Sequence, residues 1–238
     1  MKQSNPWAFF DRVYCITLAD RPDRRKSAEA EFARVGLAGR VEFVMARRHP
    51  SNSEKGIYLS HLKCLRKGID AGARVMAVFE DDVVFDRFNP AVLKESTGFL
   101  SACPGWNILF FGCLVRGSRP TRTTAVVAID YRCLAHAYAV HRHFALALVK
   151  KPWRQSPFDA ILKRFTHGYY AVYPTFAFQS DSATDNLRLK GLDRFRRLCG
   201  GLQRIQKVNE WYYRNRSLVI AAHLFLALVL VLILPLVW

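Results

Sequence analysis

The sequence has few acidic residues, no C-x-x-C motif and no apolar stretch near its start. Its 19 Asp and Glu residues stand against 36 Lys and Arg residues, which excludes an acidic surface overall. Several of the six cysteines lie in apolar segments, so we expect reduced, buried thiols rather than a disulfide framework. The opening MKQSNPWAFFDR lacks the apolar core of a signal peptide, so we expect no export signal.

What remains is the composition of a globular domain with a strong positive charge. Of the 238 residues, 51% are apolar, enough for one sizeable α/β domain, alone or with an appendage. The formal net charge of +17 favours polyanionic partners: nucleic acid, anionic lipid or a phosphorylated substrate. Composition alone does not choose among these three.

The C-terminal stretch SLVIAAHLFLALVLVLILPLVW, residues 217–238, contains no formal charge. A helix of about 20 apolar residues matches the roughly 30 Å hydrocarbon layer of a bilayer. A buried core helix is the alternative, but such helices are seldom so uniformly apolar. We therefore predict a C-terminal transmembrane helix, and with it membrane lipid as a partner of the protein.

The segment before this stretch, residues 188–216, is basic and amphipathic. Basic residues beside a span mark its cytoplasmic side, and Trp211, Tyr212 and Tyr213 suit the membrane interface. We expect a single-pass membrane protein whose main domain, residues 1–187, lies on the cytoplasmic face. A solvated basic helix without lipid contact is the alternative. The basic side chains are Arg194, Arg196, Arg197, Arg204, Lys207, Arg214 and Arg216.

Strand patterns and helix patterns alternate along the main domain. This alternation predicts an α/β fold with a mostly parallel central sheet, in which ligands bind outside the carboxyl ends of the strands. Expected strands are 12–18, 41–46, 73–79, 107–114, 124–129, 136–141 and 169–178. Expected helices are 24–35, 61–70 with Ser60 as its N-cap, 143–151 and 156–165.

The segment VFEDDVVF, residues 78–85, places three carboxylates at the end of an apolar strand. Such charge is costly unless a positive partner arrives. Residues i and i+2 of a strand project to the same side, so Glu80 and Asp82 would face one point, with Asp81 turned away or closing the turn. Oxygen ligands suit Mg²⁺ or Mn²⁺, and a divalent ion suits the pyrophosphate of a nucleotide. A solvated acidic turn is the alternative.

Four short motifs in series resemble those of glycosyltransferase family 25, the lipooligosaccharide and procollagen galactosyltransferase-like group. They are VYCITLADRPDRR near the start, SEKGIYLSHLKCLRKGI, the EDD segment, and HAYAVHRHFALAL. A later stretch, PTFAFQSDSATDN around Pro174, is similar to a further element of that family. The resemblance covers roughly residues 12–186.

The resemblance implies a nucleotide-sugar transferase of the GT-A type. Such an enzyme usually takes a UDP-sugar, often with Mn²⁺ or Mg²⁺, and here would transfer a hexose, with galactose favoured, to a saccharide or glycolipid acceptor in surface-glycan assembly. Residues implied in donor binding are Arg24, Glu54, Ser60, His61, Glu80, Asp81 and Gln179. Residues implied in metal binding are Glu80, Asp82 and His136. Gly56, Ala137 and Tyr138 complete the matched motifs.

Three positions depart from the family pattern. Thr17 stands where Asn is usual, Ile57 where Cys is frequent, and Asn107 where Asp is common. They leave the EDD unit intact, so they bear on the donor's identity more than on the reaction class. The C-terminal span is not a general feature of the family.

The transfer needs groups that stabilise the departing diphosphate and a base for the acceptor hydroxyl. Arg24 is a candidate for phosphate contact or for an ion pair with a carboxylate. Candidate catalytic bases are Asp159 and Asp185, with Asp181 behind them. Asp159 also has a purely structural explanation, since a carboxylate is favoured near a helix start. His141 and His143 lack a convincing third ligand for zinc.

Two other functions compete with this interpretation. A membrane-anchored protein that binds nucleic acid or another polyanion without catalysis would use the positive charge, but no RNA- or DNA-binding signature is present, and we expect no nucleic acid. A metal-dependent phosphohydrolase would need more Asp or His ligands at defined spacing. The sequence does not disclose the sugar, the acceptor or the oligomeric state.

Overall fold

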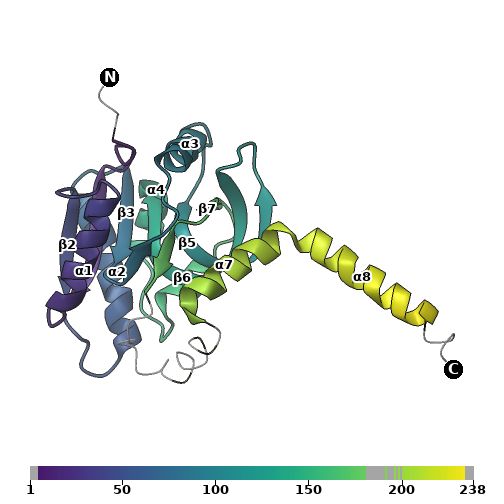
Figure 1. Cartoon of the computed structure of the whole chain (residues 1–238). Coiled ribbons are helices and arrows are strands. Elements are labelled where there is room, and N and C mark those ends of the chain that lie inside the picture. The colour runs from purple at the N-terminus through teal and green to yellow at the C-terminus, as the bar shows by residue number, and fades with distance from the viewer. Residues whose placement is uncertain (1–4, 181–190, 192–195, 197, 199, 234–238) are drawn as a thin grey trace.

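A six-stranded mixed sheet forms the centre of the molecule, in a computed structural model that describes residues 5–180, 191, 196, 198 and 200–233 (Figure 1). The strands are β1 (Arg12–Leu18), β2 (Val41–Ala46), β3 (Val75–Glu80), β4 (Val83–Phe85), β5 (Ile108–Pro120), β6 (Val126–His141), β7 (Tyr169–Val172) and β8 (Ala177–Gln179). The helices are α1 (Pro22–Arg34), α2 (Ser53–Asp70), α3 (Pro90–Ser101), α4 (Arg142–Val149), α5 (Phe158–Leu162), α7 (Gly201–Arg214) and α8 (Arg216–Ile233).

The strand order of the central sheet is β2-β1-β3-β6-β5-β7. β1 pairs in parallel with β2 and β3, and β5 pairs in parallel with β7. β6 is antiparallel to β3, β5 and β7, so it alone opposes the common direction of the other strands described in this sheet. The predicted α/β fold with a mostly parallel sheet is confirmed. Because β1 and β3 are parallel neighbours, their carboxyl ends meet at one edge of the sheet.

Helices cover both faces of this sheet. Tyr14 and Val78 point to the face covered by α2, α4 and α5, where they pack with residues such as Leu62 and Phe158. The alternate strand residues belong to a second cluster with α1, α3 and the small β4–β8 sheet. This alternation along β3 decides where its last residue points, since residues two apart share a face. Glu80 therefore falls on the α2 and α5 side.

Several predicted elements differ from the observed ones. α2 begins at Ser53, where the side chain of Asn52 accepts a hydrogen bond from the main chain of Lys55, so the predicted start at residue 61 is wrong. The predicted strands 124–129 and 136–141 are one strand, β6, which continues through Leu134 at a φ of 77°. The predicted strand 169–178 is divided between β7 in the central sheet and β8 in the small sheet.

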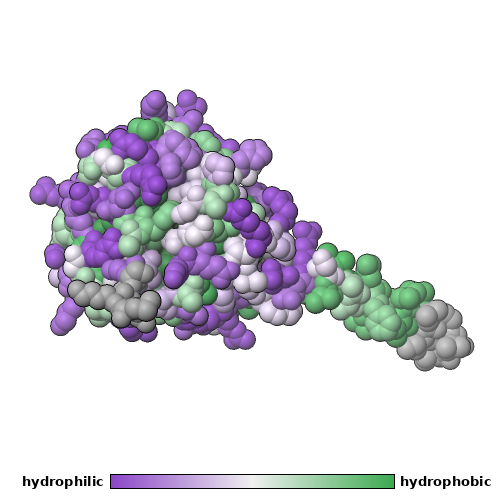
Figure 2. Space-filling view, turned by 90° about the horizontal axis from the view of Figure 1, so that it is seen from above, coloured by the Kyte–Doolittle hydropathy of each residue, from purple (hydrophilic) through white to green (hydrophobic). Residues whose placement is uncertain are grey.

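The C-terminal part of the chain forms two helices of different character. α7 packs on the domain, mainly against β5, and α8 projects away from it (Figure 1). Figure 2 shows the apolar surface of α8 beside a largely hydrophilic body. Within the described residues, no single helix passes as a membrane span by length and hydropathy. One pair does so together, Gly201–Arg214 with Arg216–Val231, bent by 76°.

These helices bear on two predicted boundaries. Residues 234–238 of the predicted transmembrane helix, and 181–190 around the predicted domain end at 187, lie outside the described residues. Over Gly201–Arg214, the basic segment is not separate from the domain but part of its packing. The hydrophobic residues exposed on this tail include Val208, Trp211, Leu218, Leu224, Phe225, Leu228 and Val231.

Candidate functional site

The carboxylate of Glu80, the last residue of β3, contacts a buried histidine of α2. His61 Nε2 lies 3.2 Å from Glu80 Oε1, and His61 Nδ1 lies 3.1 Å from the hydroxyl of Tyr138 on β6. The imidazole also stacks on the ring of Phe158, with centroids 4.2 Å apart. His61 is 1% exposed, and burial lowers its pKa to about 4, so the ring is neutral. This chain of contacts joins the predicted S-H, E-D-D and H-A-Y motifs in space.

This geometry changes the role expected of His61. The ring is enclosed by Phe158 and Tyr138, and its Nε2 contacts the Glu80 carboxylate. His61 therefore holds Glu80 in position. With Glu80 ionised, the neutral ring donates from Nε2 to the carboxylate and accepts at Nδ1 from the Tyr138 hydroxyl. The structure shows the contact of His61 with the Glu80 carboxylate, and direct contact of His61 with a donor stays a prediction.

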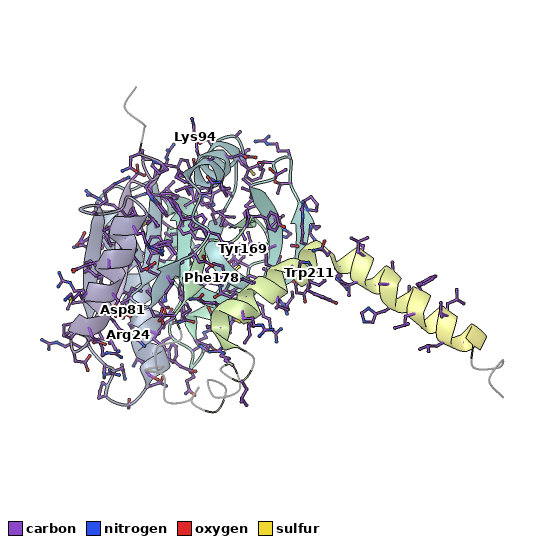
Figure 3. All side chains as sticks on the ribbon, in the orientation of Figure 1. Arg24, Asp81, Lys94, Tyr169, Phe178 and Trp211 are labelled. Atoms are coloured by element: carbon purple, nitrogen blue, oxygen red, sulfur yellow. The ribbon has the colours of Figure 1, made fainter. Side chains whose placement is uncertain are left out.

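Asp81 points to the opposite side and is held by two other residues. Thr17, at the end of β1, donates from Oγ1 to Asp81 Oδ2 at 2.8 Å. Arg24 of α1 lies with Nη1 3.5 Å from Asp81 Oδ1, and both side chains are nearly buried. Figure 3 shows Arg24 and Asp81 together at this end of the molecule. The predicted turning away of Asp81 is confirmed, and of the two roles weighed for Arg24 the structure shows the ion pair.

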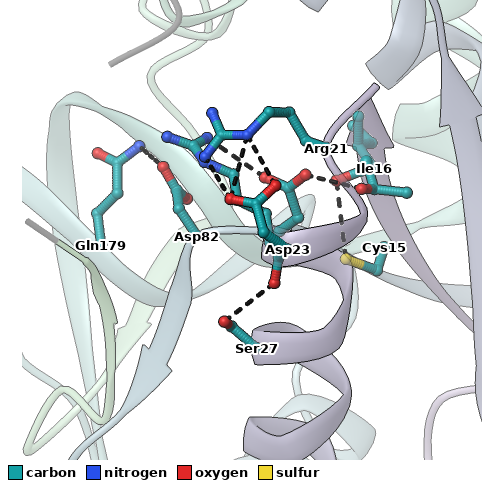
Figure 4. A network of polar contacts seen from close by, with 10 residues as sticks. Cys15, Ile16, Arg21, Asp23, Ser27, Asp82 and Gln179 are labelled. Atoms are coloured by element: carbon teal, nitrogen blue, oxygen red, sulfur yellow. Dashed lines mark hydrogen bonds and ion pairs between the residues drawn. The ribbon is translucent and has the colours of Figure 1, made fainter. Parts of the chain in front are cut away.

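Asp82 lies in the turn between β3 and β4. Its Oδ2 accepts a hydrogen bond from the side-chain amide of Gln179 at 2.8 Å, the contact drawn in Figure 4. Its main-chain carbonyl accepts from the N–H of Ser180 at 2.8 Å. The other carboxylate oxygen, Oδ1, is buried with no hydrogen-bond partner among the described residues. Buried polar atoms are rarely left unpaired, so this oxygen is suited to a ligand.

The two flanking carboxylates are both hard to ionise. Burial raises the pKa of Glu80 to about 8, the negative charges of Asp159 and Asp81 add to the rise, and Arg24 opposes it. Burial also raises the pKa of Asp82 to about 7. The charge of Glu80 adds to this rise, whereas Arg24 and the hydrogen bond from Gln179 oppose it. The negative charges of the site therefore outweigh the positive charge of Arg24. The Glu80 side chain is 27% exposed, so a cation can reach it from solvent.

Asp159, a predicted catalytic base, is tied to β6. Its Oδ1 accepts from the Tyr131 hydroxyl at 2.5 Å and from the N–H of Ala135 at 3.2 Å, and its Oδ2 accepts from the N–H of Leu134 at 3.1 Å. These bonds hold β6 at Leu134, where the backbone takes a positive φ. The observed contacts favour a structural role, although Asp159 is close enough for its charge to act on Glu80.

His136, a predicted metal ligand, does not join the carboxylates. The residue is 1% exposed, and its Nε2 lies 3.4 Å from the carbonyl oxygen of Ala177 on β8. Across the described residues, no group of three or more His, Cys, Asp and Glu side chains is arranged to hold a metal ion. The predicted set of Glu80, Asp82 and His136 is therefore not assembled, because β8 covers the face of β6 on which His136 lies.

The other predicted residues have varied positions. Ser60 is buried within α2 and donates to the carbonyl of Gly56 at 2.8 Å, so its predicted N-cap role is wrong. Glu54 lies in the first turn of α2, the end at which a carboxylate is favoured. Asp181 and Asp185 lie outside the described residues.

Sequence reasoning missed several contributors to this site. Thr17 and Tyr138 are quoted in the motifs, but their partners Asp81 and His61 become evident only when the sheet and α2 are in place. Gln206 of α7 accepts a hydrogen bond from the main chain of Gln179 at 3.3 Å, and no local pattern marks it. Among the described residues, the site has carboxylate oxygens, one of them without a hydrogen-bond partner, which suit a divalent cation, and a nearby arginine, which suits phosphate.

Several solved structures are similar to the chain at low identity. A197 from STIV covers 71% of this chain and 85% of its own, with 13% identity and a TM-score of 0.45. A glycosyltransferase involved in the glycosylation of the major capsid of PBCV-1 covers 67% and 81%, with 12% identity and a TM-score of 0.41. Mannose-1-phosphate geranyltransferase from Thermus thermophilus covers 69% and 74%, with 11% identity and a TM-score of 0.45. The curated proteins give no match to this sequence.

A match to a protein family bears directly on the site. Residues 42–103 match the family described as Glycosyltransferase family 25 (LPS biosynthesis protein). The matched segment contains α2 with His61, and β3 with the turn after it, which together hold the three carboxylates. The match supports a glycosyltransferase of glycan biosynthesis, and it confirms over these residues the resemblance to glycosyltransferase family 25 that the motifs indicated.

Proposed function

We propose that the protein transfers a hexose from a nucleotide sugar, UDP-galactose being the favoured donor, to a saccharide acceptor in lipopolysaccharide, lipooligosaccharide or a related surface glycan. The proposal includes a GT-A-type site at the carboxyl ends of β1 and β3. The family match over residues 42–103 supports the reaction class. The donor sugar rests on the family resemblance alone.

One observation carries the proposal: the carboxylates of Glu80 and Asp82 both have raised pKa values, and Oδ1 of Asp82 is buried without a hydrogen-bond partner among the described residues. Two such groups destabilise the protein when both are charged, unless a cation binds between them. A solvated acidic turn, the alternative weighed from the sequence, would show neither the shifted pKa values nor the buried Oδ1 of Asp82. A bound cation would account for so much negative charge at the end of a buried strand.

The residues fit a divalent cation. Asp82 and Glu80 would hold Mn²⁺ or Mg²⁺ through carboxylate oxygens. The described residues do not supply a full set of metal ligands, and the diphosphate oxygens of a bound donor would supply the others. When bound, such an ion supplies Lewis-acid stabilisation of the negative charge that develops on a departing diphosphate. Because Asp82 Oδ2 is already engaged by Gln179, its Oδ1 is the oxygen left to bind.

The protein's own groups then orient the reactants. Arg24 lies beside Asp81 and lowers the pKa of both neighbouring carboxylates, so its charge acts on the whole site. His61 holds the Glu80 carboxylate in place through one hydrogen bond from its Nε2. An acceptor hydroxyl needs a base, for which Asp159 and Asp185 stay candidates; the contacts of Asp159 to β6 count against it.

We also propose that α8 anchors the protein to a membrane, with the domain on the cytoplasmic side. Exposed apolar side chains on α8, among them Leu224 at 67% and Phe225 at 68%, support this because water is an unfavourable surrounding for them. The bend of 76° between α7 and α8 would lay α7 near the plane of a membrane that α8 crosses. A glycolipid acceptor would then lie at the same surface as the enzyme.

A donor screen tests the function. The full-length protein in detergent is incubated with Mn²⁺, acceptor glycan and a panel of nucleotide sugars, and release of the nucleoside diphosphate is measured. We expect release with a UDP-hexose and a loss of at least about a hundredfold in Asp82→Asn. Asp130→Asn is the matched control, because Asp130 is exposed and pairs with Arg116 away from the site. Stabilisation by oligonucleotides without any turnover would instead favour the polyanion-binding alternative.

A further inference from the structure

Gln206 of α7 is a buried polar residue that reaches the candidate site from outside the matched motifs. It is 1% exposed, although it belongs to a helix with arginine and lysine on its outer side. Its Oε1 accepts a hydrogen bond from the main-chain N–H of Gln179 at 3.3 Å. The last residue of β8 is therefore held by a helix that the sequence alone suggested was a membrane-proximal segment.

Gln179 transmits this contact to the carboxylates. Its main chain pairs with Val83 across the β4–β8 sheet, and its side-chain amide donates to Asp82 Oδ2 at 2.8 Å. The direction of that amide depends on the position of the main chain from which it projects. Gln206 thus acts on Asp82 indirectly: it accepts a hydrogen bond from the main chain of Gln179, whose side chain donates a hydrogen bond to Asp82.

The surroundings of Gln206 indicate that its oxygen is the important atom. Its amide nitrogen, Nε2, is buried with no hydrogen-bond partner within the described part of the chain. A Cβ added at Gly112 on β5 would come within 3.3 Å of this nitrogen, so the amide is closely packed. An unpaired buried amide destabilises a protein, and an apolar side chain of the same length would avoid that cost. What the glutamine provides in return is the acceptor for Gln179.

We propose that Gln206 is a positioning residue of the active site, and that α7 is a part of the catalytic domain that sets the geometry of the cation-binding carboxylate. This inference rests on the proposed function. By fixing the main chain of Gln179, Gln206 keeps the amide on Asp82 Oδ2, so that Oδ1 is the oxygen presented to the cation and the donor diphosphate.

The rest of α7 is docked independently of this contact. The side chain of Asn209 accepts from the N–H of Val115 at 2.9 Å and donates to its carbonyl at 3.1 Å. Glu210 pairs with Arg87 at 3.0 Å. Because these bonds do not involve Gln206, loss of its oxygen can be separated from loss of the helix.

The experiment compares Gln206→Met with Asn209→Ala in the full-length protein, with Gln206→Leu as a second apolar variant. We expect Gln206→Met to lower kcat/KM for the donor by roughly tenfold with an unchanged acceptor KM. Any fall in Tm is expected to be small, because the variant removes an unpaired amide nitrogen but leaves the Gln179 N–H without its acceptor. Asn209→Ala removes two hydrogen bonds to Val115 but keeps the bond from Gln179 to Gln206, and it is expected to lower Tm and to leave kcat/KM for the donor within about twofold.

A double-mutant cycle shows whether the effect passes through Gln179. In a Gln179→Ala background, Gln206→Met is expected to have almost no further effect on kcat/KM for the donor. Additive losses, or a kcat/KM for the donor that neither apolar variant changes, would overturn the inference. A wild-type protein that turns over no nucleotide sugar would overturn the proposed function itself, before any variant is compared.

Discussion

His61 Nε2 lies 3.2 Å from Glu80 Oε1, and this contact joins α2 to the end of β3 at the point where ligands bind in sheets of this kind. Burial disfavours the charged form of each residue. Burial lowers the pKa of His61 to about 4 and raises that of Glu80 to about 8, so each resists taking a charge. The pair is stable as neutral groups, and a bound cation would restore the carboxylate.

The first prediction concerns pH and follows from the carboxylates. The folded pKa values of Glu80 and Asp82, about 8 and about 7, lie above their ordinary values of 4.5 and 3.8. Between about pH 4 and about pH 8 the folded protein therefore binds more protons than the unfolded chain. The contribution of Glu80 and Asp82 to the free energy of unfolding falls as the pH rises through this range. Without metal, we expect the free energy of unfolding of Asp82→Asn, relative to wild type, to increase between pH 5 and pH 8.5.

Chemical denaturation at both pH values measures this difference. Subtracting wild type from variant removes the titrations that the two proteins share. A difference that is the same at pH 5 and at pH 8.5 would mean that Asp82 ionises as it does in water, contrary to the environment described for it.

The second prediction concerns the support of Asp81. Replacing Thr17 by Val keeps the shape of the side chain but removes the hydroxyl that donates to Asp81 Oδ2 at 2.8 Å. We expect a loss of about 1–3 kcal/mol in the free energy of unfolding, because a buried carboxylate oxygen loses its partner. Thr17→Ser keeps the donor and is expected to lose less. Equal losses in the two variants would show that packing of the methyl group, not the hydrogen bond, is what matters.

The third prediction compares two glycines. A Cβ at Gly112 would lie 1.7 Å from the carbonyl oxygen of Ala177, so β5 and β8 could not keep their spacing. We expect Gly112→Ala to destabilise the fold severely, as seen by a lowered Tm and weakened donor binding. At Gly98 in α3 a Cβ meets nothing within 4 Å, and Gly98→Ala is expected to stabilise by about 0.5–1 kcal/mol through helix propensity. A well-folded Gly112→Ala protein would contradict the close approach of the two strands.

The fourth prediction concerns the tail. The full-length protein is expected to sediment with membranes and to stay there in high salt, because apolar burial is not screened as surface charge is. Removal of residues 217–238 is expected to release it into the supernatant. If high salt alone releases the intact protein, charge on α7 and the domain surface would be holding it, and α8 would need another apolar partner.

How far the sequence predicted this structure depends on how local each signal is. β1 and β2 follow directly from their apolar patterns, and their predicted bounds are the observed ones. The place of the carboxylates at the end of β3 could be predicted for the same reason. α2 could not be delimited, since its first turn is polar and its start depends on the side chain of Asn52.

Contacts between distant segments could not be predicted in this way. The partner of Thr17 lies 64 positions along the chain, and only the parallel pairing of β1 with β3 brings the two together. The sequence of α7 predicted a segment at the membrane surface because basic and aromatic residues are frequent in it. The polar residues that dock it on the domain, Gln206 and Asn209, resemble ordinary solvent-facing residues in a helix. Their role depends on the edge of β5 and β8 that they meet.

The fifth prediction concerns the central claim: that the EDD carboxylates bind a divalent cation together with a nucleotide diphosphate. Calorimetric titration of UDP into the full-length protein, with and without Mn²⁺, measures this directly. We expect one site whose affinity rises at least about tenfold with Mn²⁺, and no such rise in Asp82→Asn. Equal UDP binding by both proteins with and without the metal, or no binding at all, would contradict the account.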